Sequence, residues 1–235
     1  SYVITALGEG QHACSVTATD IAGNVSPAAT VTVNVSLTGP APVTNLVVTD
    51  DVAPVTGPLT SGATTNDNTP TLSGGAGTAG NIVTVYDGTT VLGTVIAGAG
   101  GAWTFTTAAL SNGAHPLNVT VTDAAGNTSP ATSFPITVDT VAPVASTLVI
   151  TNDVTNVTVP NGGSTNDTTP TLRGTVSTAE AGGRVTISDG TTVLGTAIVQ
   201  SDGTWSFTTT APSVGTHPLS VTVTDPSCNV SRLTS

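Results

Sequence analysis

The sequence has no lysine and only three arginines, against 14 aspartates and glutamates, which gives a formal net charge of −11 at pH 7. Nucleic acids and anionic membrane surfaces attract basic proteins, because cationic side chains neutralise their phosphates. We therefore expect neither as a partner. The acidity leaves two physical possibilities, which are self-repulsion that keeps the chain soluble and neutralisation by bound cations.

Aromatic residues are also scarce, at 3%. Any core must therefore be built mostly from valine, leucine, isoleucine and alanine. No apolar run approaches the roughly 18 residues of a membrane-spanning helix, and the N-terminus lacks the basic-then-apolar pattern of a signal peptide. We expect no membrane span. Threonine, valine, glycine and serine dominate instead, which indicates β-strands and turns.

A long internal period organises the chain. Asp20, Asp123 and Asp225 recur at intervals of 103 and 102 residues, and they open the similar strings "TDIAGNVSP", "TDAAGNTSP" and "TDPSCNVSR". "TNDNTPTLSG" recurs as "TNDTTPTLRG" at an offset of 100, and "DGTTVLGT" recurs unchanged at an offset of 102. A unit of about 100 residues is too long for a solenoid coil and has the size of a domain. The sequence therefore predicts domains in tandem.

The one complete repeat shows the strand pattern. Leu117, Val119 and Val121 alternate with polar residues, and Trp103 and Phe105 share one face of another run. Short alternating runs separated by turn residues are typical of an immunoglobulin-like β-sandwich. The predicted fold is therefore all-β. The seven strands expected in this repeat cover 45–50, 69–74, two runs within 82–97 that join at Asp87-Gly88, 102–107, 115–123 and 133–139.

The period divides the chain into one complete repeat and two partial ones. Residues 1–38 hold the last two strands of a repeat, 39–139 form a complete repeat, and 140–235 form a repeat without its last strand. The domains at both chain ends are therefore expected to be incomplete. Two explanations stay open. The chain is either a fragment of a longer array, which we favour, or its N-terminal hairpin supplies the missing strand of another molecule.

The two cysteines fall in different repeats. Cys14 occupies the position that Leu117 has in the next repeat, so it is interpreted as a core residue. Cys228 replaces Gly126 in the loop that Asp225 opens. A disulfide within one domain is therefore excluded, and this pair does not indicate a redox compartment.

The strings "TVTDAAGNTSPAT", "VDTVAP", "TNDNTPTLSG" and "DGTTVLGT" resemble the bacterial Ig-like repeats of giant, type I-secreted surface adhesins of Gram-negative bacteria. The resemblance covers essentially the whole chain. It implies an extracellular, cell-surface stalk of many such domains, associated with adhesion and biofilms and commonly stiffened by calcium. It also implies that the host or surface ligand is bound elsewhere in the parent protein. Two features depart from the pattern, because the Asp225 loop has lost its glycine and "NVSLTGPAP" (34–42) lacks the linker aspartate of "VDTVAP".

One junction between repeats collects candidate calcium ligands. In a seven-stranded sandwich the loop between the last two strands faces the preceding linker, so Asp225 and Asn229 are expected to meet Asp139. Ca²⁺ takes six to eight oxygen ligands, Mg²⁺ demands a tighter octahedron, and softer metals need clustered histidine or cysteine. Aspartate and asparagine also favour turns for their own hydrogen bonds, so a plain turn is the alternative. Further candidates at the same junction are Asp51, Asn66 and Asp67, in the loop between the first two strands of the preceding repeat.

The preceding junction, at Ser36, offers fewer candidate calcium ligands. Asp123 and Asn127 are the candidates there, but the linker supplies Ser36 in place of an aspartate. Asp20 and Asn24 would serve a junction with a repeat that is not in this sequence. The acidic loops therefore predict a calcium site at the Asp139 junction first and at the Ser36 junction second.

Several residues that recur in each repeat are interpreted as structural. The histidines share one position at the start of the penultimate strand, and no G-x-S-x-G string accompanies them. Each tryptophan alternates with a phenylalanine two residues on, as expected of a core strand rather than a sugar-binding platform. We therefore expect no enzyme. These residues are His12, His115 and His217, Trp103 and Trp205, and the hairpin-turn residues Asp87 and Asp189.

The sequence thus predicts a structural spacer of a bacterial surface adhesin, in which calcium stiffens the junctions between Ig-like repeats. Two other functions stay open. A module that binds a carbohydrate or a protein would carry a feature present in one repeat only. The loop 177–184, with Glu180 and Arg184, is the one that differs in charge from its counterpart. An Ig-like phage fibre or decoration domain would share the fold without needing calcium.

Overall fold

The computed structural model describes residues 6–144, 147–210 and 213–232. Its regular elements are β-strands and two three-residue 3₁₀ turns, η1 (Ala99–Gly101) and η2 (Thr178–Glu180). The predicted all-β fold is confirmed. None of the helical segments in these ranges is long and apolar enough to cross a membrane.

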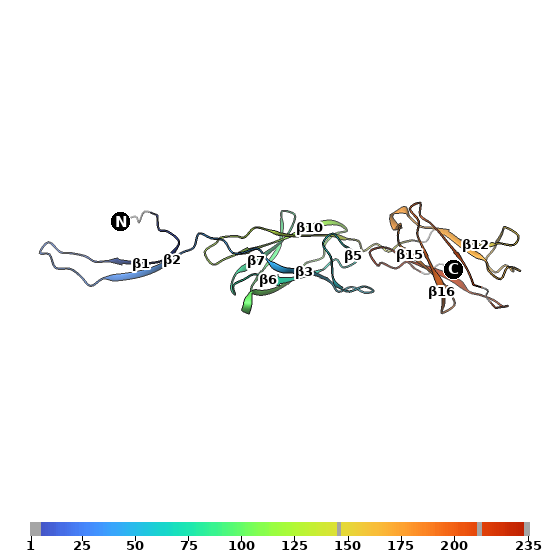
Figure 1. Cartoon of the computed structure of the whole chain (residues 1–235), viewed down its shortest axis with the longest axis horizontal. Helices are drawn as coiled ribbons and strands as arrows, with labels where there is room; N and C mark the ends of the chain where they lie inside the picture. Colours follow the sequence, from blue (N-terminus) through green and yellow to red (C-terminus); the bar gives the residue numbers. More distant parts are fainter. Residues whose placement is uncertain (1–5, 145–146, 211–212, 233–235) are drawn as a thin grey trace. The chain divides into compact units, whose positions relative to one another are not determined.

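The first two strands form a hairpin, drawn in blue in Figure 1. β1 (Gly10–Val16) and β2 (Ala29–Val35) pair antiparallel, with Cys14 opposite Val31. Val16, Val31 and Val33 are exposed, and Cys14 is only half-buried. The apolar side chains of this hairpin are therefore not enclosed by the described part of the chain, and both cysteines are free.

The middle domain has two sheets. Their strand orders are β4-β3-β6-β9 and β5-β11-β10-β7-β8. All seven predicted strands are present. The two-residue strands β4 and β5 were not predicted, because so short a strand leaves no periodic pattern in the sequence. The strands are β3 (Thr44–Asp50), β4 (Gly57–Pro58), β5 (Thr64–Thr65), β6 (Thr71–Gly75), β7 (Ile82–Asp87), β8 (Thr90–Ile96), β9 (Ala102–Thr106), β10 (Gly113–Thr122) and β11 (Thr132–Val138).

The period-two pattern places the core where the sequence predicts it. Leu117, Val119 and Val121 are fully buried on one face of β10. Trp103 is buried on β9, and Phe105, two residues on, is half-buried opposite Leu72 of β6. Each fully buried leucine or valine stabilises the fold by about 1.5–3 kcal/mol.

The described part of the third domain, in orange and red in Figure 1, repeats the four-stranded sheet and three strands of the five-stranded one. Its sheets have the orders β13-β12-β14-β17 and β16-β15-β18. Leu172, Ile187, Val221 and Trp205 belong to its buried core. β18 occupies the place that β10 has in the middle domain and pairs with β15. The strands are β12 (Thr147–Asn152), β13 (Val157–Val159), β14 (Thr171–Thr175), β15 (Arg184–Asp189), β16 (Thr192–Ile198), β17 (Thr204–Thr208) and β18 (Leu219–Thr224).

One glycine within the repeated string "DGTTVLGT" makes room for an aromatic ring. A Cβ at Gly195 would lie 2.5 Å from Cε2 of Phe207, and a Cβ at Gly93 would lie 2.7 Å from Cε2 of Phe105. A glycine inside a strand usually marks such a close approach. The strand therefore needs glycine at this position in both domains.

The chain is divided into two compact units. The first contains the β1–β2 hairpin and part of the middle domain, and the second contains the rest of the middle domain and the third domain. Each candidate loop therefore lies in the same unit as the linker that precedes it. The first unit comprises Ser1–Val48, Thr71–Thr107 and Pro116–Phe134, and the second comprises Thr49–Pro70, Ala108–His115 and Pro135–Ser235.

Candidate functional site

The repeated acidic loop is a turn held together by its aspartate. Asp225 Oδ1 accepts a hydrogen bond from the backbone N–H of Asn229 at 2.8 Å, and Oδ2 accepts one from its side-chain Nδ2 at 2.9 Å. The backbone N–H of Asp225 donates to the carbonyl of Asn229 at 3.0 Å. These bonds confirm that the loop is a turn of the kind aspartate and asparagine favour. The same bonds join Asp123 with Asn127 and Asp20 with Asn24.

The asparagine of the loop also reaches the preceding linker. Asn229 Nδ2 donates to the backbone carbonyl of Asp139 at 2.8 Å. Asn127 Nδ2 donates in the same way to the carbonyl of Ser36 at 3.1 Å. Because the loop aspartate takes one hydrogen of the amide, the other is available to the linker. We call this arrangement of loop aspartate, loop asparagine and linker carbonyl the linker clamp.

Asp139 is held by three further bonds. Its backbone N–H donates to the carbonyl of Thr65 at 2.9 Å. Its Oδ1 accepts from the backbone N–H of Val141 at 3.0 Å, and its Oδ2 accepts from the hydroxyl of Ser227 at 3.3 Å. The linker and the loop after it therefore meet, as the sequence predicts.

Glu180 adds a third carboxylate that the sequence did not assign to this place. Burial, followed by the negative charges of Asp225 and Asp139, raises the pKa of Glu180 above its ordinary value. The sequence had singled out the loop 177–184 for its charge, but as a binding loop of the third domain. The structure places its glutamate beside the linker clamp instead.

The other predicted ligands, Asp51, Asn66 and Asp67, take part in hydrogen bonds within the fold. Asp67 is fully buried, and its carboxylate accepts from the backbone N–H groups of Thr69 at 2.8 Å and Asp51 at 3.3 Å. Asn66 donates from Nδ2 to the carbonyl of Ala53 at 3.1 Å. Its buried Oδ1 has no hydrogen-bond partner among the described residues. An unsatisfied buried acceptor costs about 1–3 kcal/mol.

The acidic side chains do not close around one point. Over the described ranges, no group of three or more Asp, Glu, His or Cys side chains is arranged to hold a metal ion. Asp123 and Asn127 belong to the first compact unit, whereas Asp139 and Asp225 belong to the second. A cation at Asp139 would therefore need backbone, amide and water oxygens beside the carboxylates, which calcium accepts.

The turn aspartates act as ionised acceptors. The hydrogen bond from the Asn127 side chain, followed by the one from its backbone, lowers the pKa of Asp123 below 3.8. Asn24 lowers the pKa of Asp20 in the same way. A carboxylate that accepts several hydrogen bonds favours its charged form. The turn is therefore formed at neutral pH and weakens only in acid.

Each recurring histidine bonds to a backbone carbonyl four residues before it, and His217 also bonds to a hairpin-turn aspartate. His217 Nδ1 lies 2.7 Å from Oδ2 of Asp189, and its Nε2 lies 2.8 Å from the carbonyl of Ser213. In the middle domain, Nε2 of His115 lies 2.7 Å from the carbonyl of Ser111. The hydrogen bond to Asp189, followed by the one to Ser213, raises the pKa of His217 above 6.5. These contacts give the histidines a structural role.

The family model of the bacterial Ig-like domain matches the chain over residues 38–140 and 146–235. No curated protein matches the sequence of this chain.

Three solved structures are similar to the chain in fold. A biofilm associated protein, solved as its BSP domain, shares 18% identity with a TM-score of 0.28, over 74% of this chain and 28% of that one. The fibronectin(III)-like modules of Clostridium thermocellum CbhA share 17% identity with a TM-score of 0.42, over 80% and 90%. A 1.5-MDa bacterial ice-binding adhesin, studied for its host cell surface retention, shares 21% identity with a TM-score of 0.38, over 95% and 72%. The chain thus spans 28% of the length of the first of these.

Proposed function

Because the chain belongs to the bacterial Ig-like domain family, we propose that it is a structural spacer segment of a large bacterial surface adhesin. It lies outside the cell and projects a binding region located elsewhere in the parent protein. Its immediate partners are neighbouring Ig-like repeats, and it has no enzymatic activity. The observation that carries this proposal is the linker clamp, which recurs at Ser36 and at Asp139.

A spacer holds its length only if its linkers resist bending. Interfaces between tandem domains are small, so relative motion is the default. The clamp opposes that motion by tying the linker to a loop of the following domain. Since it uses a backbone carbonyl, the bond forms equally on Ser36 and Asp139. A contact that survives a change of linker residue supports a mechanical role common to all repeats rather than a ligand site in one of them.

Calcium is proposed to stiffen the Asp139 junction further. The carboxylates of Asp139, Asp225 and Glu180 lie near enough to raise the pKa of the last of them. The backbone carbonyl of Thr65 accepts a hydrogen bond from the Asp139 N–H. The next residue, Asn66, has a buried side-chain Oδ1 without a hydrogen-bond partner. These donors are oxygens only, which suits a hard cation with loose geometry. Bound there, calcium would neutralise the repelling carboxylates and tie the linker to both of its neighbours.

The junction at Ser36 offers fewer ligands. Its loop presents Asp123 and Asn127, and its linker offers a hydroxyl in place of a carboxylate. Fewer charged oxygens mean lower calcium affinity. We therefore propose that the Asp139 junction binds calcium first and that the Ser36 junction depends chiefly on its clamp.

Thermal unfolding with calcium, with magnesium and with a chelator tests the calcium proposal. A rise in Tm that is specific to calcium is expected, since binding to the folded state alone stabilises it. Asp139→Ala should abolish the rise, and Asp20→Ala, which removes an aspartate from a loop outside the junction, should leave it intact. Equal effects of both ions, or none, would reject calcium and leave the clamp as the sole stiffening element.

Small-angle X-ray scattering tests the spacer itself. Replacing both clamp asparagines, in an Asn127→Ala, Asn229→Ala variant, should broaden the distribution of interatomic distances because the linkers are released. The Asn118→Ala variant removes a half-buried asparagine that donates to Pro116 of its own strand and lies outside the clamp, so it serves as the control. A double variant with the wild-type distribution would contradict a mechanical role for the clamp.

A further inference from the structure

The peptide group between Asp139 and Thr140 is held on both sides. Its carbonyl accepts the hydrogen bond from Asn229 Nδ2 at 2.8 Å that belongs to the linker clamp. Its N–H donates to Oδ1 of Asn112 at 3.1 Å. A trans peptide group is planar, and its C=O and N–H point in opposite directions. Two asparagines, one from each domain, therefore bind the same rigid unit of the linker from opposite sides.

Asn112 binds the linker through a single oxygen. The hydroxyl of Thr140 donates to the same Oδ1 at 2.9 Å, so this oxygen accepts two hydrogen bonds, as its two lone pairs allow. One residue earlier, the backbone N–H of Asp139 donates to the carbonyl of Thr65 at 2.9 Å. Two successive N–H groups of the linker are thus fixed to the middle domain. All of these residues belong to the second compact unit.

A glycine turn precedes the strand that follows Asn112. Gly113, the first residue of β10, has φ 130°, and the glycines at the same position of the other repeats, Gly10 and Gly215, have φ 120° and 153°. Residues with a Cβ rarely adopt such a backbone, whereas glycine does so readily. The recurrence of this glycine therefore keeps the turn, and the place of the residue before it, in every repeat.

The residue before this glycine differs between the repeats. In the first repeat, Glu9 Oε2 accepts a hydrogen bond at 2.8 Å from the hydroxyl of Thr38, two residues after Ser36. In the third repeat it is Val214, which is exposed and has no acceptor on its side chain. An oxygen at this position therefore bonds to the following linker in the first two repeats, although different side chains supply it.

We propose that Asn112 is a positioning residue of the junction between the middle and third domains. It orients the peptide group after Asp139 for the amide of Asn229, so the linker resists bending before any cation binds. Without Asn112, this peptide group is free to turn, and the linker clamp must order it on binding. The inference rests on the proposed spacer role, because it names a second contact by which the same linker keeps its direction.

The distance between two spin labels measures bending at this junction. Thr89 and Thr191 are exposed in equivalent hairpin turns of the two domains, and Thr89→Cys and Thr191→Cys provide the labelling sites. Cys14→Leu and Cys228→Gly, which introduce the residues of the middle domain, remove the native thiols. Double electron–electron resonance is recorded on this labelled parent in the presence of a chelator, so that calcium does not contribute.

Asn112→Val introduces the residue of the third domain. It should make the distance distribution about one and a half times as broad, because relative motion of tandem domains is the default once the linker is released. Asn112→Asp keeps an oxygen acceptor and should restore the width of the labelled parent. Asn161→Val is the matched control. It removes an exposed asparagine that also precedes a glycine, in a turn of the third domain outside the junction, and should leave the width unchanged.

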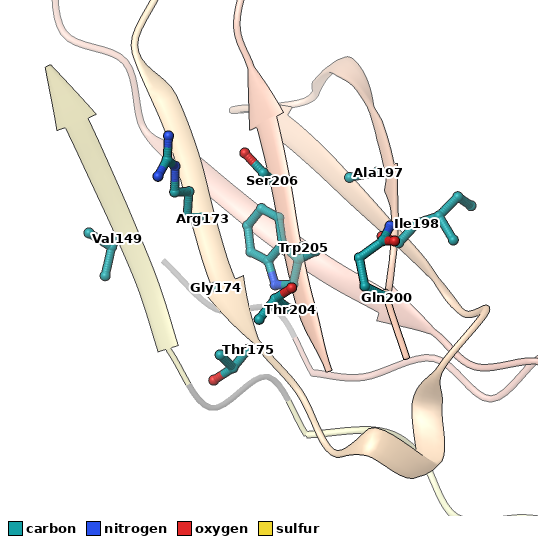
Figure 2. A pocket seen from close by; sticks show the side chains of 10 residues that line it. All are labelled: Val149, Arg173, Gly174, Thr175, Ala197, Ile198, Gln200, Thr204, Trp205 and Ser206. Carbon is teal, nitrogen blue, oxygen red and sulfur yellow. The ribbon is translucent and has the colours of Figure 1, made fainter. Parts of the chain in front are cut away.

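Tryptophan emission shows whether both domains stay folded in these variants. Trp103 and Trp205 are buried, one in each domain. Figure 2 shows Trp205 on β17, in the wall of a pocket lined only by residues of the third domain. The emission should be the same in every variant, because Asn112 and Asn161 are exposed and their loss removes no core packing.

Three results would overturn the proposal. They are a width that Asn112→Val leaves unchanged, an equal increase with Asn161→Val, and an Asn112→Asp distribution as broad as that of Asn112→Val. Asn229→Ala on the same labels tests the linker clamp itself. If Asn229→Ala broadens the distribution and Asn112→Val does not, the spacer role stands and this inference fails. If neither variant broadens it, both fail.

Discussion

The side-chain amide of Asn229 donates to the backbone carbonyl of Asp139 over 2.8 Å, while Asp225 holds the same amide at 2.9 Å. The aspartate therefore positions the asparagine, and the asparagine positions the linker. Because every linker residue has a carbonyl, this contact tolerates changes of sequence in the linker. It explains how the loop can recur although Ser36 stands where the next linker has an aspartate.

Removing the amide should weaken the third domain. Asn229→Ala leaves the Asp139 carbonyl and Asp225 Oδ2 without their donor, so we expect a loss of about 1–2 kcal/mol in the free energy of unfolding. Urea unfolding followed by Trp205 fluorescence in a Trp103→Phe background measures it. Asn127→Ala is the reciprocal control, and it should leave the Trp205 transition unchanged. An Asn229→Ala transition identical to the wild type would show that the clamp contributes nothing.

Glu180→Gln should stabilise the third domain at neutral pH in the presence of a chelator. The folded-state pKa of Glu180 is raised, so its ionisation opposes folding, and stability is lost as pH rises through that pKa. The gain in Tm should vanish well below pH 4.5, where the wild-type side chain is already neutral. Thermal scans from acid to neutral pH test this. Glu9→Gln changes the net charge equally elsewhere and should not reproduce the effect.

His217 should stabilise the third domain most when it is protonated. Its folded-state pKa is raised, chiefly by the hydrogen bond to Asp189. Its contribution is therefore fully present below about pH 6.5, the unfolded value, and is lost as pH rises through the folded pKa. The difference in Tm between the wild type and His217→Gln should shrink from pH 5.5 to pH 8.5. Asp189→Asn should remove most of this dependence, and a constant difference would contradict the prediction.

Cys228→Gly should stabilise the loop that Asp225 opens. Cys228 has φ 72°, whereas the glycines at the same position, Gly23 and Gly126, both have φ 90°. A left-handed conformation costs a residue with a Cβ about 1–2 kcal/mol, which exceeds the entropic cost of glycine. We expect a gain of up to about 1 kcal/mol in urea unfolding. Gly126→Ala, which meets no atom within 4 Å and so reports the backbone alone, should lower the stability of the middle domain.

Much of the fold could be predicted because strand burial has a period of two. Leu117, Val119 and Val121 alternate with polar residues, and all three are fully buried. The short strands β4 (Gly57–Pro58) and β5 (Thr64–Thr65) were not predicted, because two residues are too few to show an alternating pattern. Topology also predicted that the Asp225 loop meets Asp139, because the ends of a sandwich bring those segments together.

The sequence by itself determined the tandem β-sandwiches, the acidic character and the loops at the junctions, since these follow from periodicity, charge and turn chemistry. Only the tertiary structure decided what the loop atoms do. The sequence assigned Asn229 as an oxygen ligand, whereas the folded chain directs its N–H groups to Asp225 and Asp139. The folded chain also placed Glu180 beside the junction. Such neighbours come from strands and loops far apart in the chain, so their meeting depends on packing and leaves no local pattern.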